Sequence, residues 1–297
     1  MPRKVAIVVR TKDRPHFLSR ALESISRQQM PDWECVIVND GGAKDAVERL
    51  VEDLPVDVRG RVSVIHHPQP RGRWVSANVG VLATSSPLLV LHDDDDSWHP
   101  EFLSTAVAYL EEHPAREGVV SRTEIRWEEM EGNDFRTVER ELFQPQLTAP
   151  TLSDTLLFNR FVPIAFVYRR SLHAEIGLYT ESLPVVGDWD FNLKVLARGP
   201  LDYMDTRPLA YWHQRRGVAG PGGNSVIDAE SSHRHYDAQI RDAALRDYVS
   251  ENGNGLVLYL TKFIDTRLVE VEEGIRRAVI DASTITRIRR RLRRRRA

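Results

Sequence analysis

The chain has 297 residues, and its 41 lysines and arginines nearly balance its 43 aspartates and glutamates, for a formal net charge of −2. Eight arginines lie among the last eleven residues, so the rest of the chain is acidic. A nucleic-acid-binding body is excluded, because its positive charge would spread over a face of the fold. Hydrophobic content of 41% and charged content of 28% are typical of a globular protein.

The chain shows no sign of membrane insertion or of a disulfide framework. No apolar run approaches the ~20 residues that cross a bilayer, and the five apolar residues before Arg10 are too few for a signal peptide. A single cysteine, Cys35, excludes an intrachain disulfide and a cysteine-based zinc site. We therefore expect a cytoplasmic protein.

The first hundred residues alternate short apolar runs with stretches of helical period. The apolar runs, which predict buried strands, are 5–9, 35–38, 62–65 and 88–91. The stretches of helical spacing are 17–25, 47–51 and 75–83. This rhythm predicts an α/β fold with an open, mostly parallel sheet flanked by helices.

Polar or glycine-bearing segments follow three of the predicted strands, at 10–14, 39–42 and 92–96. The carboxyl ends of parallel strands meet at one edge of an open sheet, where ligands bind. We therefore expect these segments to converge on one site.

The second half is less regular. Strand-like pieces lie at 119–127 and 165–168, a turn at 132–134, helices at 171–176 and 189–197, and a glycine-rich loop at 217–225. From Leu256 to Leu292 apolar residues recur with the helical period of about 3.6. This pattern predicts one long amphipathic helix, or two helices broken near Gly274 or 281–284.

Four consecutive aspartates, 93–96, follow the fourth predicted strand. Carboxylate oxygens suit hard ions such as Mg²⁺ or Mn²⁺, and Asp93 and Asp95 project alike in an extended chain. An EF-hand is excluded, because Trp98 and Ser104 stand where that loop needs glycine and glutamate. The alternative is a solvated loop whose last carboxylates cap the helix beginning near Pro100.

Five ordered blocks of the chain resemble family 2 inverting glycosyltransferases of the GT-A, Rossmann-like fold. The segment Leu91–Pro100 resembles the family's Asp-x-Asp-Asp-x-aromatic-x-Pro motif, and Gly187–Phe191 resembles the Glu-Asp-Trp-Asp block. The other three blocks are 8–15, 36–41 and 71–80. The resemblance covers roughly residues 4 to 225.

The resemblance implies a metal-dependent, inverting transfer of a sugar from a nucleotide-diphosphate donor, expected to be a UDP-sugar, to a hydroxyl of a glycan or lipid-linked acceptor. It implies that Asp95, with Asp93, binds Mn²⁺ or Mg²⁺, which offsets the charge of the leaving diphosphate. It also implies that Asp188 is the general base. An apolar setting around Asp188 is expected to raise its pKa.

Donor binding and acceptor binding are assigned from the same resemblance. The donor-binding residues implied are Arg10, Thr11, Arg14, Asp40, Arg73, Asn78, Asp93 and Asp94. The weaker assignments, to the acceptor or to a mobile lid over the pyrophosphate, are Trp189, Asp190, His213 and Arg215.

Each assignment has a plainer alternative. In these alternatives Asp188 would be an N-cap of the predicted helix, and Asp40 would form an Asx turn with the glycines after it. Arg10 and Arg14 would be solvated surface arginines. Trp189 is a buried core residue. The chain departs from the family at Gly187, where the usual residue is acidic, and this puts the acceptor in doubt more than the catalysis.

We divide the chain into a catalytic domain, residues 1–225, and a helical extension, 226–297, that ends in the arginine-rich tail. Within the domain, about 1–100 holds the nucleotide sugar and 101–225 the acceptor. Three alternatives are open for the arginine-rich tail: contact with the inner face of the plasma membrane, contact with nucleic acid, or a disordered end. Of the two partners, nucleic acid is the less favoured. The long helix covers the catalytic domain or pairs two subunits.

Two other functions remain. A sugar-phosphate nucleotidyltransferase would carry a glycine-rich loop after the first strand, and residues 10–15 contain no glycine. A non-catalytic adaptor with a glycosyltransferase fold would not be expected to retain Asp93, Asp95 and Asp188 together.

Overall fold

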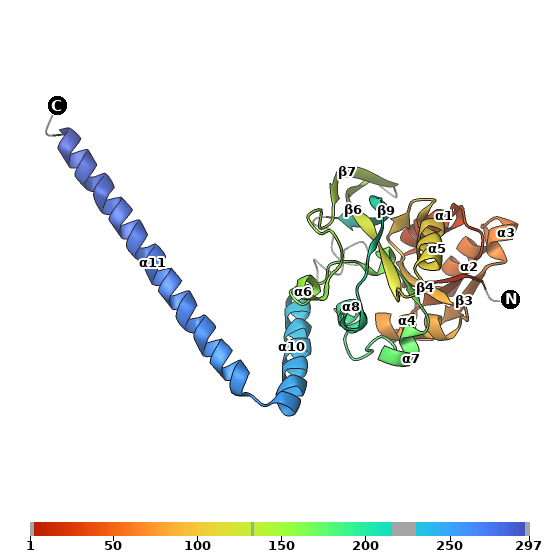
Figure 1. Ribbon diagram of the computed structural model, residues 1–297. Coiled ribbons are helices and arrows are strands. Elements are labelled where there is room, and N and C mark those ends of the chain that lie inside the picture. Colours follow the sequence, from red (N-terminus) through yellow and green to blue (C-terminus); the bar gives the residue numbers. More distant parts are fainter. Residues whose placement is uncertain (1–2, 132–133, 216–229, 295–297) are drawn as a thin grey trace. The chain divides into compact units, whose positions relative to one another are not determined.

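The computed structural model describes residues 3–131, 134–215 and 230–294 (Figure 1). The chain divides into two units, Met1–Asp237 and Ala238–Ala297, and each is described by itself. The first unit is the α/β domain that the alternating pattern predicts. It contains the residues expected to bind substrate.

In the described part of the first unit, nine strands form one sheet in the order β3-β2-β1-β4-β8-β6-β9-β5, with β7 paired to β6. The four predicted N-terminal strands are β1 (Val5–Thr11), β2 (Trp33–Asn39), β3 (Val62–His66) and β4 (Leu88–Asp93). They are mutually parallel. The strands β1, β2 and β3 follow one another outward in one direction, and β4 then returns to the other side of β1, as in doubly wound sheets.

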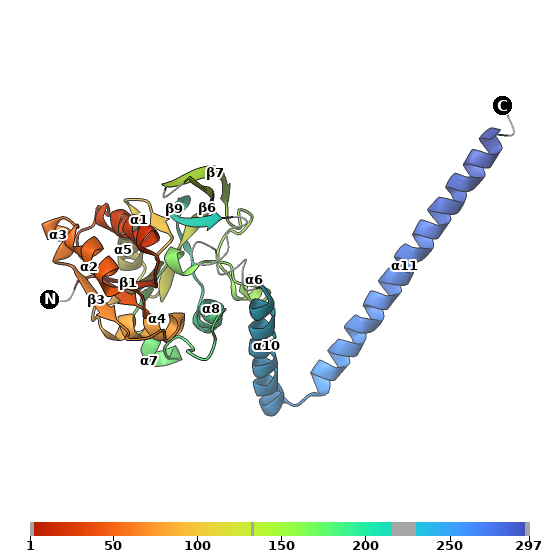
Figure 2. The same ribbon diagram turned by 180° about the vertical axis from the view of Figure 1, so that it is seen from behind.

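Helices cover both faces of the parallel strands (Figures 1 and 2). The helices of the first hundred residues are α1 (Pro15–Ser26), α2 (Lys44–Glu52), α3 (Val56–Arg59) and α4 (Arg73–Leu82). Pro15 stands in the first turn of α1, where it breaks no helical hydrogen bond. Helix α4 packs closely on β1 at Gly80, where an added Cβ would lie 2.3 Å from a methyl of Val8.

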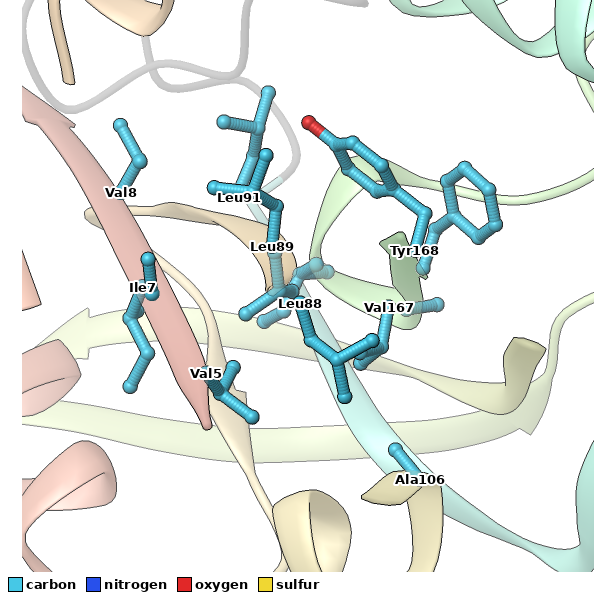
Figure 3. Close-up of a cluster of buried hydrophobic side chains, with 14 of the residues drawn as sticks. Val5, Ile7, Val8, Leu88, Leu89, Leu91, Ala106, Val167 and Tyr168 are labelled. Atoms are coloured by element: carbon cyan, nitrogen blue, oxygen red, sulfur yellow. The ribbon is translucent and has the colours of Figure 1, made fainter. Parts of the chain in front are cut away.

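The core lies on and beside the central strands. Every residue of β1 is buried, as a continuous apolar run predicts for a strand covered on both faces. Figure 3 shows side chains of β1, β4 and β8 lying together, among them Val5, Leu89 and Val167. This packed centre fixes the strand ends that carry the polar segments.

The second half of the sheet is mixed in direction. Its strands are β5 (Ser97–Trp98), β6 (Gly118–Glu131), β7 (Asp134–Leu142), β8 (Phe166–Arg169) and β9 (Tyr203–Arg215). Strand β8 is antiparallel to β4, and β6 and β9 run parallel to each other. The long strand β9 has no counterpart in our sequence predictions, although it carries two of the predicted site residues.

Short helices connect these strands. They are α5 (Phe102–Glu112), α6 (Leu152–Thr155), the 3₁₀ turn η1 (Pro163–Ala165), α7 (Leu172–Ile176) and α8 (Gly187–Arg198). Helices α7 and α8 lie where the sequence predicts them.

The C-terminal residues form α10 (Glu230–Asn252) and α11 (Gly255–Arg294). Helix α11 confirms the single long amphipathic helix, and it continues through Gly274 and 281–284. The chain leaves the helical conformation at Gly253, whose φ of +72° is left-handed. The predicted glycine-rich loop at 217–225 lies outside the described residues. Among the helices described, none is long and apolar enough to span a bilayer.

Candidate active site

The polar segments that follow β1, β2 and β4 do meet at one edge of the sheet. In the strand registers Arg10 lies opposite Asp93, and Thr11 lies opposite Asn39. This edge is the point where the strand order reverses between β1 and β4, the usual position of a ligand site in an open α/β sheet.

The four aspartates that begin at the last residue of β4 point to different partners. Asp93 pairs with Arg10, and Asp94 accepts a hydrogen bond from the Thr11 hydroxyl at 2.8 Å. Asp96 is buried and accepts the backbone N–H of His213 at 2.9 Å. Burial, followed by the charges of Asp95 and Asp93, raises the pKa of Asp96 well above its ordinary value. Burial likewise raises the pKa of Asp94 to about 7, against the opposing charge of Arg14.

The carboxylate of Asp95 is held by two arginines. Its Oδ2 accepts hydrogen bonds from Arg14 at 2.6 Å and from Arg215 at 2.8 Å. Burial would raise the pKa of Asp95, but the charges of Arg14 and Arg215 lower it below the ordinary value. The capping alternative for this run is wrong, because Glu101 is the N-cap of α5 and no side chain caps that helix. Because both bind Asp95, Arg14 and Arg215 are partners of the aspartate run.

His213 and Arg215 lie on β9 and are buried. Glu128 Oε1 lies 2.5 Å from His213 Nδ1, and the Ser97 hydroxyl lies 2.7 Å from Nε2. Burial lowers the pKa of His213 to about 4, so the imidazole is neutral near pH 7. Although burial opposes it, the hydrogen bond with His213 and the charge of Arg20 hold the pKa of Glu128 at about 2.

Asp40 fastens the loop that leads into α4. Its Oδ1 accepts the backbone N–H of Arg71 at 2.8 Å and lies 2.8 Å from His67 Nδ1, and its Oδ2 accepts the backbone N–H of Gly72 at 2.9 Å. Burial alone would raise the pKa of Asp40, but the hydrogen bonds from His67, Arg71 and Gly72 lower it. The turn that the sequence assigns to Asp40 is instead made by Asn39, whose Oδ1 accepts the Gly42 N–H at 3.1 Å.

Three other predicted site residues are used within the fold. Asn78 donates to the backbone oxygen of Tyr179 and accepts its N–H, at 2.9 and 3.0 Å. Trp189 is buried and donates its indole N–H to the Thr155 carbonyl at 2.7 Å. Asp190 accepts from Thr180 and pairs with Lys194 one turn along α8. These contacts account for the polar groups named without invoking substrate.

Asp188 lies in the first turn of α8 and is not its N-cap, because the helix begins at Gly187 with Val186 as the cap. Burial, followed by the charge of Asp93, raises its pKa, and the N–H of Trp189 with the charges of Arg73 and Arg10 opposes the rise. The direction is the one that the sequence predicts. The side chain of Arg73 is exposed and lies within electrostatic reach of Asp93 and Asp188.

The backbone just before Asp188 is strained. Val186 has a φ of +56°, which is rare for a β-branched residue. Such outliers cluster at functional sites, where the surrounding structure holds them in place.

An amide relay that our sequence predictions missed orients Asp188. The side chain of Asn159 donates to Asp188 Oδ2 at 2.8 Å. Asn192, which is buried on α8, donates in turn to Asn159 Oδ1 at 2.9 Å and to the Phe161 carbonyl at 3.4 Å. Asn159 lies in an irregular segment 29 residues before Asp188, so no spacing rule connects the two.

Trp74 explains why residue 187 is glycine. A Cβ added at Gly187 would lie 2.6 Å from both Cε2 and Nε1 of the Trp74 indole. The Trp74 ring stacks on Tyr179 with centroids 5.3 Å apart, and the Arg10 guanidinium lies 4.9 Å from the Trp74 ring centroid. The indole therefore occupies the space that a side chain at 187 would need.

The carboxylates at the end of β4 have the right chemistry for a hard divalent ion, since Asp93 and Asp95 both present oxygen. As they lie, however, each already accepts from a guanidinium. In the part of the chain that the structure describes, no group of three or more His, Cys, Asp or Glu side chains is arranged to hold an ion. The donor atoms fit a metal, and the arginines compete for them.

Comparison with known proteins agrees with this architecture. The glycosyl transferase family 2 model matches residues 6–177. The chain belongs to glycosyl transferase family 2. An uncharacterised glycosyltransferase of Bacillus subtilis, YwdF, is 35% identical over 193 residues, 64% of this chain and 67% of that protein. A PGL/p-HBAD biosynthesis glycosyltransferase of Mycobacterium bovis is 30% identical over 234 residues, 76% of this chain and 81% of the relative. The protein is therefore a glycosyltransferase.

Two solved structures share the fold. Staphylococcus aureus TarS 1–349 in complex with UDP-GlcNAc superposes with a TM-score of 0.58 at 21% identity, over 85% of this chain and 75% of that one. The mannosyltransferase PcManGT from Pyrobaculum calidifontis, in complex with GDP-Man and Mn²⁺, superposes with a TM-score of 0.54 at 16% identity, over 90% of this chain and 81% of that one. These likenesses confirm the predicted GT-A fold.

Proposed function

We propose that this glycosyltransferase transfers a sugar from a UDP-sugar to an acceptor hydroxyl with inversion at C1, using Asp188 as the general base. The observation that carries the proposal is the placement of Asp188. It lies in the first turn of α8, where burial and then the charge of Asp93, at the end of β4, raise its pKa. A base near the donor edge can take the acceptor's proton as the oxygen attacks from the face opposite the leaving group.

The donor's diphosphate would lie at the ends of β1 and β4. Arg10, Arg14, Arg73 and Arg215 supply guanidinium donors there, whose fork geometry matches phosphate oxygens. Their charge would stabilise the diphosphate as it leaves. Asp40 supports the same region by holding the 67–72 loop, so that Arg73 begins α4 beside the site.

Asp95, with Asp93, would hold a divalent ion of the Mn²⁺ or Mg²⁺ type. When bound, that ion would supply further positive charge against the diphosphate. The Mn²⁺ complex of PcManGT, which has the same fold, supports this assignment. The UDP-GlcNAc complex of TarS supports a UDP-sugar as the donor.

The acceptor hydroxyl would approach Asp188 between α8 and the 152–161 segment. Asn159 donates to Oδ2 of Asp188 and so orients the carboxylate that would receive the proton. A glycan or lipid-linked acceptor agrees with the relative named for PGL/p-HBAD biosynthesis. We propose residues 1–225 as the catalytic domain, 226–297 as a helical extension, and the arginine tail as a contact with the inner membrane face.

Calorimetry tests the proposal. The purified chain should bind UDP in the presence of Mn²⁺, and Asp188→Asn should bind UDP with similar affinity while losing sugar transfer. Failure to bind any nucleotide diphosphate with any divalent ion would contradict the enzyme assignment. Unchanged turnover in Asp188→Asn would remove Asp188 as the base.

A further inference from the structure

Asp95, the aspartate that we assign to the metal, is already bound by two guanidiniums. Both Arg14 and Arg215 bind its Oδ2 oxygen. Arg14 also pairs with Asp94 at 3.0 Å, and Arg215 lies 3.4 Å from a carboxylate oxygen of Glu128. A cation approaching Asp95 meets two guanidiniums first, in a partly buried setting where charges are poorly screened.

The aromatic ring of Phe17 holds these two arginines in place. The Arg14 and Arg215 guanidinium carbons lie 4.5 and 4.3 Å from the Phe17 ring centroid. Phe17 also stacks on Phe135, with the centroids 5.0 Å apart. Cation–π contact of this kind favours the paired arrangement over one in which the arginines point into solvent.

The charged groups around Asp95 already pair with one another: Arg14 with Asp94 and Asp95, Arg215 with Asp95 and Glu128, and Arg20 with Glu128. A divalent ion that enters this set alone adds two positive charges. An ion that enters together with a diphosphate brings opposing negative charge with it.

We propose that Arg14 and Arg215 keep Asp95 closed to a divalent ion until the donor's diphosphate draws their guanidiniums away, so that ion and donor bind as a pair. This inference rests on the proposed function. The diphosphate offers the guanidiniums acceptors equivalent to the carboxylate that they leave. The released carboxylate then gains the ion in their place.

The test measures Mn²⁺ binding by the loss of the free-ion electron paramagnetic resonance signal, with and without UDP. For wild type we expect weak Mn²⁺ binding alone and an affinity about 5- to 150-fold higher with UDP, the range usual for coupled sites. By linkage, Mn²⁺ must raise the UDP affinity, followed by calorimetry, by the same factor. Equal Mn²⁺ affinity with and without UDP would overturn the inference.

Variants separate the two arginines. Arg14→Gln, in a partly exposed side chain, and Arg215→Gln should each increase Mn²⁺ affinity without UDP and decrease UDP affinity. Arg215→Lys, which keeps the charge, replaces Arg215→Gln in the test if the Gln variant unfolds. It should retain most of the coupling between Mn²⁺ and UDP. Arg207→Gln is the matched control, because Arg207 is exposed and pairs with Asp205 and Glu101. It should change neither affinity.

The outcomes distinguish this inference from the proposed function. If UDP and Mn²⁺ both bind, but independently, Arg14 and Arg215 do not close Asp95 to the ion. The same holds if the Gln variants leave Mn²⁺ affinity unchanged. In both cases the glycosyltransferase assignment stands. If UDP does not bind under any condition, the proposed donor is wrong.

Discussion

Replacing Asn159 by alanine should shift the pH dependence of the reaction. The substitution removes the 2.8 Å hydrogen bond to Asp188 Oδ2. A hydrogen bond to a charged group contributes about 1.5–3 kcal/mol. We take the lower end, because Asp188 is only half-buried. That value corresponds to a change of about tenfold in the protonation equilibrium of the carboxyl.

The sign follows from the chemistry. The donated hydrogen bond stabilises the carboxylate, so its loss adds to the rise in the pKa of Asp188 that burial and Asp93 already cause. A base works only when deprotonated, and the acidic limb of the rate profile should therefore move to higher pH. Arg73 and Arg10, which oppose the rise, remain in place in the variant.

The assay is nucleotide diphosphate release at saturating donor as a function of pH. Asn192→Ala, which removes only the support of Asn159, should shift the limb in the same direction by less. Asn159→Asp, which places a second carboxylate beside the base, should shift it further. A profile for Asn159→Ala that is lower at every pH but has an unmoved limb would refute the relay and leave Asn159 with a merely structural part.

Three other substitutions or truncations test separate parts of the account. Gly187→Glu should lower the free energy of unfolding by about 1–3 kcal/mol through overpacking against Trp74, as measured by denaturant titration. Adding Trp74→Ala should restore part of the loss. No loss in Gly187→Glu would show that the Trp74 indole moves freely. Asp40→Ala should weaken UDP binding in calorimetry, because the 67–72 loop loses three hydrogen bonds; unchanged affinity would make that loop irrelevant to the donor. Deleting 287–297 should abolish co-sedimentation with anionic liposomes, and equal pelleting would dismiss the membrane contact.

The sequence predicted the half of the fold whose signal is local. The apolar runs of β1, β2 and β4 are continuous because both of their faces are covered, and the helices between them have a clear 3.6-residue period. Strand β9 was missed because it alternates poorly and contains Pro208, and its place is decided by pairing with β6 and β5. Its conformation depends on distant partners.

The candidate site divides in the same way. The aspartate run and Asp188 are visible as motifs, whereas Arg20, Glu128 and Asn159 resemble ordinary polar residues until the fold brings them to the site. Arg215 lies 120 residues from Asp95. No local pattern predicts which distant arginine neutralises which carboxylate, and that pairing decides whether a motif aspartate is open to an ion.

The most direct test of the central claim is release of nucleotide diphosphate from a panel of UDP-, GDP- and dTDP-sugars by wild type and by Asp188→Asn, with Mn²⁺ present. We expect wild type to release UDP from at least one UDP-sugar. The variant should bind that donor equally well and release UDP about 10²- to 10⁴-fold more slowly, the usual contribution of a general base. Equal rates in the two proteins, or release from none of the donors, would contradict the account.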